Sequence, residues 1–440
     1  MNKISRERNN PLGLGELIAV ALGGMVGGGI FSILGISTEQ IGNATPIAIL
    51  VGGLLAFFAA YSYVKLALLY KDEGATYSFF KKTFPQSRMA SSIIGWLITF
   101  GYISTLALYA FTFSSYFCSQ IESLNHPLGQ KLVAGAIISV FAIVNLISVK
   151  GMGKVEDVMV YTKIIILLFI SGLLAGKGDL QKLQPLISVD TTWMQVLIVS
   201  AITFVAYEGF QLVINAYDEM DKPQVNIPRA IYISIGIAIT LYVVLAVAAL
   251  SVIPKENIIA DKEYALAAGA KTFLGGFGQF IVIFGALLAT SSAISGTLFG
   301  ASRLMAVISK DGFFPKPLGE KIQTYIPYKA IITMSILAWI LVLSGGLQVI
   351  LEFGSITFIL VSFLMAVANF KKRKETNSSP WFTGIAMFGL LIAAILIVYF
   401  EFTENLSQFI VILGCYLLLA IGAMLYSRKN QPSSDVNPEK

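Results

Sequence analysis

The chain has 440 residues, of which 56% are hydrophobic and 13% are charged, with a mean hydropathy of +0.77 and a net charge of +6. Soluble domains have roughly 45–50% apolar and about 25% charged residues, so this composition excludes a soluble protein and predicts a polytopic membrane protein. The cysteines, Cys118 and Cys415, lie in apolar segments and indicate no disulfide framework, and the single histidine, His126, excludes a multi-histidine metal site. We therefore expect no metal and no cofactor.

Runs of about 20 apolar residues are long enough to cross a bilayer as helices. The sequence predicts twelve such spans, at 14–41, 46–70, 91–121, 131–149, 156–176, 192–217, 229–251, 272–302, 328–344, 347–369, 381–400 and 406–427. Residues 1–13 and 428–440 are predicted to be cytoplasmic tails. No cleavable signal is expected, because the polar residues 1–10 lead directly into a full-length span.

The distribution of positive charge predicts the orientation. With the N-terminus inside, most of the 31 Lys and Arg residues fall on cytoplasmic segments, as the positive-inside rule requires. The few on the outside are Lys131, Lys177, Lys182, Lys255, Lys262 and Lys271. Both termini are therefore expected inside, at a plasma (inner) membrane, and the basic balance is assigned to loops rather than to a nucleic-acid partner.

The first predicted span contains a glycine-rich run, residues 23–29. Each glycine lowers helix propensity by up to about 1 kcal/mol relative to alanine. Lipid offers no hydrogen-bond partner to a freed backbone group, so a weakened helix needs protein, water or a ligand beside it. Two interpretations stay open: close helix packing through small residues, or a broken helix whose bare backbone binds a substrate.

The sixth predicted span has a second interruption, where Glu208 and Gly209 fall near its centre. Interruptions at corresponding positions of two halves are a sequence indicator of a transport site. The halves share no direct sequence identity, so the repeat is inferred from position alone.

Four groups of segments carry a resemblance to a known family: residues 23–35, 60–63 with 72–77, 204–210 with 218–230, and 291–315. Their order and the twelve-span layout resemble the amino acid–polyamine–organocation (APC) transporters, in their prokaryotic amino acid permease branch. The resemblance implies an all-α, five-plus-five inverted repeat (LeuT-like) with discontinuous helices one and six. Residues 14–176 and 192–369 would form the two repeats, and 381–427 would form spans eleven and twelve.

The broken helices favour an amino acid zwitterion as substrate. N–H groups at Gly27, Gly28 and Gly29, with the helix beginning near Ile30, suit a carboxylate. Carbonyls at the end of the preceding half-helix, with those near Phe204 and Ala206 in span six, suit an ammonium group. The predicted substrate contacts are Met25, Val26, Gly27, Gly28, Gly29, Phe204, Ala206, Tyr207 and Glu208. The three glycines are expected to leave room for a bulky or a broad set of neutral substrates.

Three of these side chains have competing interpretations. The resemblance places Phe204 as an aromatic lid, although most phenylalanines here are core or lipid-facing. Tyr207 is expected to pack against a neighbouring span, with a polar contact as the alternative. Glu208 could bind a cationic side chain, transfer a proton or hold span six to a neighbour, because an ionisable group inside a membrane is costly and often functional.

Lys163 in the fifth span is the candidate coupling residue. It lies about 10 Å from the helix start at 1.5 Å per residue, a long reach for a snorkelling side chain. Desolvation favours the neutral amine, so Lys163 could change protonation state. The resemblance implies that it fills the place of a sodium ion, touching Gly23 and a hydroxyl from Ser291 or Ser292. Lys65, by contrast, is expected to snorkel or pair.

The sequence therefore predicts a secondary active transporter importing amino acids by alternating access, proton-coupled and sodium-independent. The alternatives are an obligate exchanger and a transporter of polyamines or inorganic cations. An enzyme is not expected, because no zinc-protease motif or Ser/His pair is present. Substrate choice would depend on spans three, eight and ten, around Tyr102, Ser295 and Phe353, and no obligate protein partner is indicated.

Overall fold

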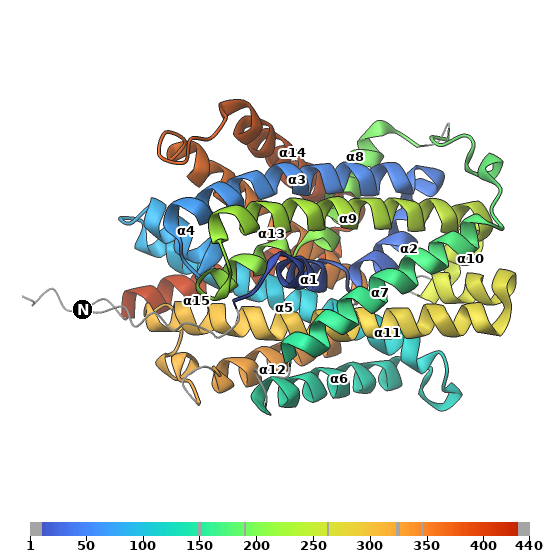
Figure 1. Cartoon of the computed structure of the whole chain (residues 1–440), viewed down its shortest axis with the longest axis horizontal. Helices are drawn as coiled ribbons and strands as arrows, with labels where there is room; N and C mark the ends of the chain where they lie inside the picture. Colours follow the sequence, from blue (N-terminus) through green and yellow to red (C-terminus); the bar gives the residue numbers. More distant parts are fainter. Residues whose placement is uncertain are drawn as a thin grey trace, which may run out of the picture.

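The computed structural model describes residues 11–147, 152–188, 191–261, 264–322, 326–344 and 346–429. Within these ranges the chain is helical and forms no strand beyond two isolated bridges, Leu12 with Met220 and Ile322 with Ile326. Most long helices run close to the longest axis of the molecule (Figure 1). The all-α prediction is confirmed.

The helices of the first half are α1 (Leu14–Met25), α2 (Gly29–Ile41), α3 (Thr45–Tyr70), α4 (Ala75–Thr83), α5 (Arg88–Cys118), α6 (Pro127–Ile147) and α7 (Met152–Ala175). The second half contains α8 (Trp193–Thr203), the 3-10 segments η4 (Phe204–Tyr207) and η5 (Phe210–Glu219), α9 (Pro223–Val252), α10 (Lys255–Asp261), α11 (Ala265–Lys310), α12 (Tyr328–Ser344) and α13 (Leu347–Lys371). Two further helices follow, α14 (Pro380–Glu404) and α15 (Leu406–Lys429).

Ten helical stretches in the described residues are long and apolar enough to cross a membrane, and α1 and α12 are shorter apolar helices. Every predicted span range contains helix, and the protein is a multi-pass membrane protein. The count of twelve spans and the limits of the two repeats stay predictions. Two details differ from the expected layout: α4 occupies the loop after α3, and α11 is 46 residues long, with a bend at Gly275 (φ +72°).

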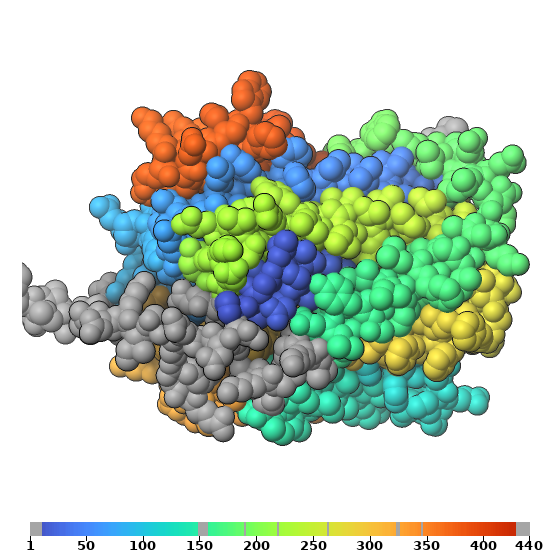
Figure 2. Space-filling model, in the orientation of Figure 1, coloured from blue at the N-terminus to red at the C-terminus, as the bar shows by residue number. Residues whose placement is uncertain are grey.

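The interrupted first and sixth spans lie at the centre of the bundle. The helix α1 packs against α9, α7, α11 and η5, while η4 contacts α3 and α13. In Figure 1 the short α1 lies in the middle of the molecule, and Figure 2 shows it reaching the surface between α9 and α7. The two C-terminal helices lie outside this centre, where α14 packs on α13, α3 and α8, and α15 packs on α5.

Apolar side chains cover the outer faces of the peripheral helices. On α14 and α15 the exposed side chains include Phe388, Ile395, Leu418 and Leu425. A face of this kind is stable against lipid and not against water. Around the two interruptions, by contrast, polar side chains such as Lys163 and Glu208 are buried.

Candidate functional site

The first span is interrupted for three residues. Its first half, α1, ends at Met25, and Val26 leaves the helical conformation (φ −84°, ψ 77°). The Gly27 N–H donates to the Met25 carbonyl at 3.0 Å, which closes a tight turn. The helix resumes as α2 at Gly29. The prediction of a break between Met25 and Ile30 is therefore accurate to one residue.

The sixth span is interrupted at Glu208 and Gly209. Glu208 is extended (φ −72°, ψ 143°). Gly209 has a φ of +123°, a backbone conformation that residues other than glycine rarely adopt. The two breaks touch through backbone: a Cβ on Gly209 would lie 2.5 Å from the carbonyl carbon of Gly24. A Cβ on Gly24 would lie 3.0 Å from the Gly209 Cα. Glycine is therefore required on both sides of this crossing.

Carbonyl groups at the end of α1 accept hydrogen bonds from side chains of other spans. The Tyr109 hydroxyl on α5 donates to Gly24 at 2.9 Å, and the Tyr242 hydroxyl on α9 donates to Met25 at 2.7 Å. The same Tyr242 oxygen lies 3.1 Å from the Ala206 carbonyl, so one hydroxyl bridges the two breaks. The carbonyls of Met25 and Ala206, expected to receive an ammonium group, are held by a protein donor in this structure.

Neither tyrosine was predicted from the sequence. A buried tyrosine normally finds a hydrogen-bond partner for its hydroxyl, so Tyr109 and Tyr242 inside apolar spans carried a signal. A single sequence does not show how α5 and α9 are rotated and placed against α1, so the carbonyls that accept these hydrogen bonds could not be predicted.

The ammonium group of Lys163 lies where the resemblance implied. The side chain is fully buried, and its Nζ donates to the Gly23 carbonyl and to the Ser292 hydroxyl, both at 3.3 Å. These contacts join α7 to α1 and to α11. Of the two serines considered, Ser292 makes the contact, and Ser291 is only half-buried. Such bonds offset part of the cost of burying a charge.

Glu208 has a different balance of hydrogen bonds. Its side chain is 2% exposed, and one oxygen accepts a bond from Gln211 Nε2 at 2.6 Å. The Ser362 hydroxyl lies within hydrogen-bonding reach of the carboxyl group, but the other oxygen, Oε1, receives no hydrogen bond from the described residues. The Gln211 Oε1 in turn accepts the Gly209 N–H at 3.2 Å, so Gln211 supports the break itself. A buried oxygen without a hydrogen bond is costly, so Oε1 has capacity for a donor from Ser362, from a water molecule or from a ligand.

A small cavity of about 10 Å³ lies beside Glu208, roughly the room of one water molecule. It is enclosed by α1, α5, the sixth-span break, α11 and α13, through Gly24, Tyr102, Thr105, Tyr109, Glu208, Gly209, Leu212, Thr297 and Phe358. Spans three, eight and ten thus contribute to it. Of the three side chains expected from those spans to influence substrate choice, Tyr102 lines the cavity and Ser295 and Phe353 do not; Thr297 and Phe358 line it from spans eight and ten.

In this conformation there is little space for a side chain at Gly27, Gly28 or Gly29, and their role as substrate contacts stays a prediction. A Cβ on Gly27 would lie 2.6 Å from the Ala293 Cβ, and one on Gly28 would lie 2.7 Å from the Thr112 Oγ1. A Cβ on Gly29 would lie 3.1 Å from Ala206. The glycines therefore pack the start of α2 closely against its neighbours, which is the first of the two interpretations drawn from the sequence.

Two aromatic residues of η4 lie outside the cavity lining. Phe204 is fully buried at the start of η4, and its role as a lid stays a prediction. The Tyr207 hydroxyl donates to the Ile49 carbonyl on α3 at 2.8 Å, and its ring lies 5.2 Å from that of Tyr242. Tyr207 therefore packs against neighbouring spans, as expected, and also makes the polar contact given as the alternative. Its assignment as a substrate contact stays a prediction.

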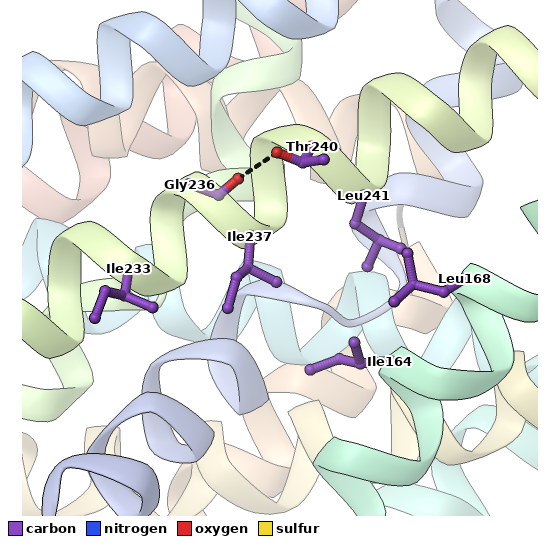
Figure 3. A pocket seen from close by; sticks show the side chains of 7 residues that line it. All are labelled: Ile164, Leu168, Ile233, Gly236, Ile237, Thr240 and Leu241. Carbon is purple, nitrogen blue, oxygen red and sulfur yellow. Dashed lines mark hydrogen bonds between the residues drawn. The ribbon is translucent and has the colours of Figure 1, made fainter.

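A larger hollow of about 480 Å³ lies between α7 and α9 (Figure 3). Its lining is apolar except for Thr240, whose hydroxyl donates to the Gly236 carbonyl of its own helix at 2.9 Å. No polar group is left to orient a ligand there. We therefore place the candidate site at the two breaks and not in this groove.

The arrangement at the breaks can hold opposite charges at separate places. The N-terminus of α2 favours an anion, because the first N–H groups of a helix lack intrahelical partners. The end of α1 and the carboxyl group of Glu208 favour cations. This chemistry fits a zwitterion or a cation and needs no covalent step.

Comparison with known proteins places the chain in a family. Residues 12–426 match the family described as amino acid permease. The inner membrane transport protein YbaT of Escherichia coli (strain K12) is 28% identical over 433 residues, which cover 97% of this chain and 99% of that protein. The branched-chain amino acid permease BcaP of Bacillus subtilis (strain 168) is 26% identical over 450 residues, which cover 97% and 94%.

A solved structure shares the fold. The crystal structure of the Eremococcus coleocola manganese transporter matches with a TM-score of 0.62 and 13% identity, over 94% of each chain. At this identity the likeness concerns the fold alone. The family match over residues 12–426, nearly the whole length, shows that the chain belongs to the amino acid permease family.

Proposed function

We propose that this protein is a secondary active transporter that imports amino acids across the membrane by alternating access. The family is one of transporters, and the two interrupted helices bring an anion-favouring helix start and cation-favouring carbonyls to the centre of the bundle. A substrate ammonium group would take over the Met25 and Ala206 carbonyls from the Tyr242 hydroxyl. The small cavity beside Glu208 would be the part of the substrate site that stays open in this conformation.

We propose further that transport is proton-coupled and sodium-independent. The observation that carries this is the buried Lys163 ammonium, hydrogen-bonded to Gly23 and Ser292. A fixed positive charge at these oxygens disfavours a sodium ion at the same place. Loss of the lysine proton would weaken both bonds and release α1 from α7 and α11, which links protonation to the movement of the first span.

The substrate class depends on Glu208. Its unpartnered oxygen beside the cavity favours a role toward substrate or proton over a purely structural bridge. A neutral amino acid would leave this oxygen to a proton or a water molecule, whereas a cationic side chain would pair with it directly. Among the described residues no group of three or more acidic, histidine or cysteine side chains could hold a metal ion, which weighs against an inorganic cation.

The test is uptake of a radiolabelled amino acid mixture into empty proteoliposomes without sodium, with and without an inward proton gradient. Stimulation by the gradient is expected. Uptake that requires vesicles preloaded with amino acid would show an obligate exchanger instead and make Lys163 a fixed structural charge. Absence of both would contradict amino acid transport.

We also propose a plasma (inner) membrane location with both termini cytoplasmic and no obligate partner subunit. The support is the excess of Lys and Arg on segments that this orientation places inside. Epitope tags at each end should be accessible to antibody only in inside-out vesicles. Protection of either tag there would contradict the orientation.

A further inference from the structure

Two carboxyl side chains face each other away from the breaks, Glu352 on α13 and Glu401 on α14. Both are completely buried, and the two groups lie within hydrogen-bonding reach of each other. They come from the beginning of α13 and the last turn of α14, helices that pack side by side. Nothing in the proposed substrate site uses them.

The hydrogen bonds around this pair are incomplete. Glu352 Oε1 accepts a bond from Gln348 Nε2 at 2.8 Å, one turn earlier on the same helix. Glu352 Oε2 and both oxygens of Glu401 receive no donor from the protein. In the described part of the chain, the only titratable group acting on either carboxyl is the other one. None of the lysine, arginine or histidine residues that the structure describes neutralises them.

This arrangement has one simple chemical solution. An ionised carboxylate only accepts hydrogen bonds, so two ionised groups cannot bond to each other, whereas one protonated group can donate to its neighbour. Two like charges in an apolar interior would also repel and lose hydration. One proton placed between the two groups removes a charge and satisfies two of the unpartnered oxygens.

We propose that Glu352 and Glu401 form an intramembrane proton-binding site, in which a proton held between the two carboxyl groups at neutral pH fastens α14 to α13. A metal ion fits less well. Ions that prefer oxygen ligands take about six or more of them, and the third polar group here, Gln348, turns its N–H toward Glu352.

The pair lies one helical turn from a contact with α8, the first half of the sixth span. Ser355 on α13 donates to the Ile202 carbonyl, in the last turn of α8, at 2.8 Å. The helix α14 also packs on α8. Release of the proton would leave two repelling carboxylates and separate α14 from α13 beside α8. This second site is distinct from Lys163, which acts on α1.

The test is infrared absorption of protonated carboxyl groups in purified, substrate-free protein at neutral pH, compared in H₂O and D₂O. The wild type minus Glu352→Gln/Glu401→Gln difference spectrum isolates this pair from Glu208. A deuterium-sensitive carboxyl band is expected in that difference. Glu404→Gln, an exposed position on the same helix, is the matched control and should leave the spectrum unchanged. A double variant with the wild-type spectrum would overturn the proposal.

A second measurement keeps the proposal open to refutation if the spectra overlap. Glu352→Leu and Glu401→Leu should each lower the thermal midpoint, because each leaves a lone buried carboxyl group. The double leucine variant should be more stable than either single variant, since it removes both polar groups. If the two single-variant losses in thermal midpoint simply add in the double variant, the proposed interaction between the two carboxyl groups is wrong. Loss of the carboxyl band on adding Mg²⁺, Ca²⁺ or Mn²⁺ would show a cation site and would also overturn the proposal. Neither measurement requires transport activity.

Discussion

The two interruptions at the centre of the molecule differ in how their polar groups are satisfied. At the first-span break, the carbonyls of Gly23, Gly24 and Met25 accept bonds from Lys163, Tyr109 and Tyr242. At the sixth-span break, an oxygen of Glu208 has no partner. The polar groups at the first-span break are therefore satisfied by protein donors, which we call the closed break, whereas the sixth-span break keeps one oxygen without a donor, which we call the open break.

This difference indicates separate tasks for the two breaks. The first break is held by donors from α5, α7 and α9, so its position depends on the state of those side chains, above all on the charge of Lys163. At the sixth break, the carboxyl group of Glu208 can accept a further hydrogen bond and lies beside a cavity. We infer that the first break responds to protonation and that the sixth break is better placed to distinguish substrates.

The largest effect is expected where the two breaks touch. Gly209→Ala should prevent normal folding, because the positive φ costs about 1–2 kcal/mol and overpacking adds about 1–3 kcal/mol. Yield of monodisperse protein and its thermal midpoint measure this. Gly172→Ala on α7, where a Cβ would meet nothing within 4 Å, is the control. An unchanged midpoint for Gly209→Ala would contradict the close contact with Gly24.

The next effect concerns the closed break. Lys163→Ala should abolish uptake driven by a proton gradient, because the first half of span one loses its protonatable tie to α7 and α11. Substrate affinity should fall by no more than about tenfold, about 1.4 kcal/mol. Proteoliposome uptake and equilibrium binding separate the two quantities.

The control for Lys163 is Lys65→Ala, which removes a lysine whose Nζ makes an exposed hydrogen bond to the Asn377 carbonyl. Its uptake should be close to that of the wild type. Unchanged uptake by Lys163→Ala at neutral pH would remove the proposed coupling role and leave the first break as a purely structural feature.

The positions of the two breaks and the contacts of Lys163 could be predicted from the sequence. The breaks near Met25 and Glu208 followed from glycine content and from a carboxylate within an apolar span. The contacts of Lys163 followed from the family resemblance, although Ser291 and Ser292 could not be separated until the rotation of α11 was known. Composition and local propensity thus located the interruptions along the chain.

What the sequence could not supply is the registration of distant helices. The bridge from Tyr242 to both breaks depends on the rotation and depth of α9, and the packing of Gly28 against Thr112 depends on α5. The closeness of Glu352 and Glu401 likewise requires α14 to lie on α13 at one particular height. Such contacts arise from tertiary packing, which a single sequence does not determine.

A smaller effect is expected at the open break. Glu208→Gln keeps the size of the side chain and removes its charge. If the free oxygen recognises a cationic side chain, arginine and lysine should lose about tenfold or more as competitors, since hydrogen bonds to charged groups contribute about 1.5–3 kcal/mol. Leucine should change little. Competition against a radiolabelled substrate measures both, and equal losses would contradict recognition of the side chain by Glu208.

The smallest effect should come from the hydroxyl that joins the two breaks. Tyr242→Phe should destabilise the substrate-free protein by about 1 kcal/mol, the net value of a typical hydrogen bond. With a saturating amino acid, identified by uptake, the loss should shrink, because the substrate ammonium group would occupy the Met25 and Ala206 carbonyls that the hydroxyl otherwise holds. Thermal midpoints with and without substrate give the comparison.

Tyr416→Phe is the control for this last variant, because the Tyr416 hydroxyl also bonds to a neighbouring helix, to the Thr357 hydroxyl at 2.7 Å and the Phe353 carbonyl at 3.2 Å on α13, and to neither break. Its loss of stability should be the same with and without substrate. If Tyr242→Phe behaves in that way too, the hydroxyl and the substrate do not share the carbonyls. The first break would then stay closed by tyrosine throughout transport, and the ammonium group would have to bind at the sixth break alone.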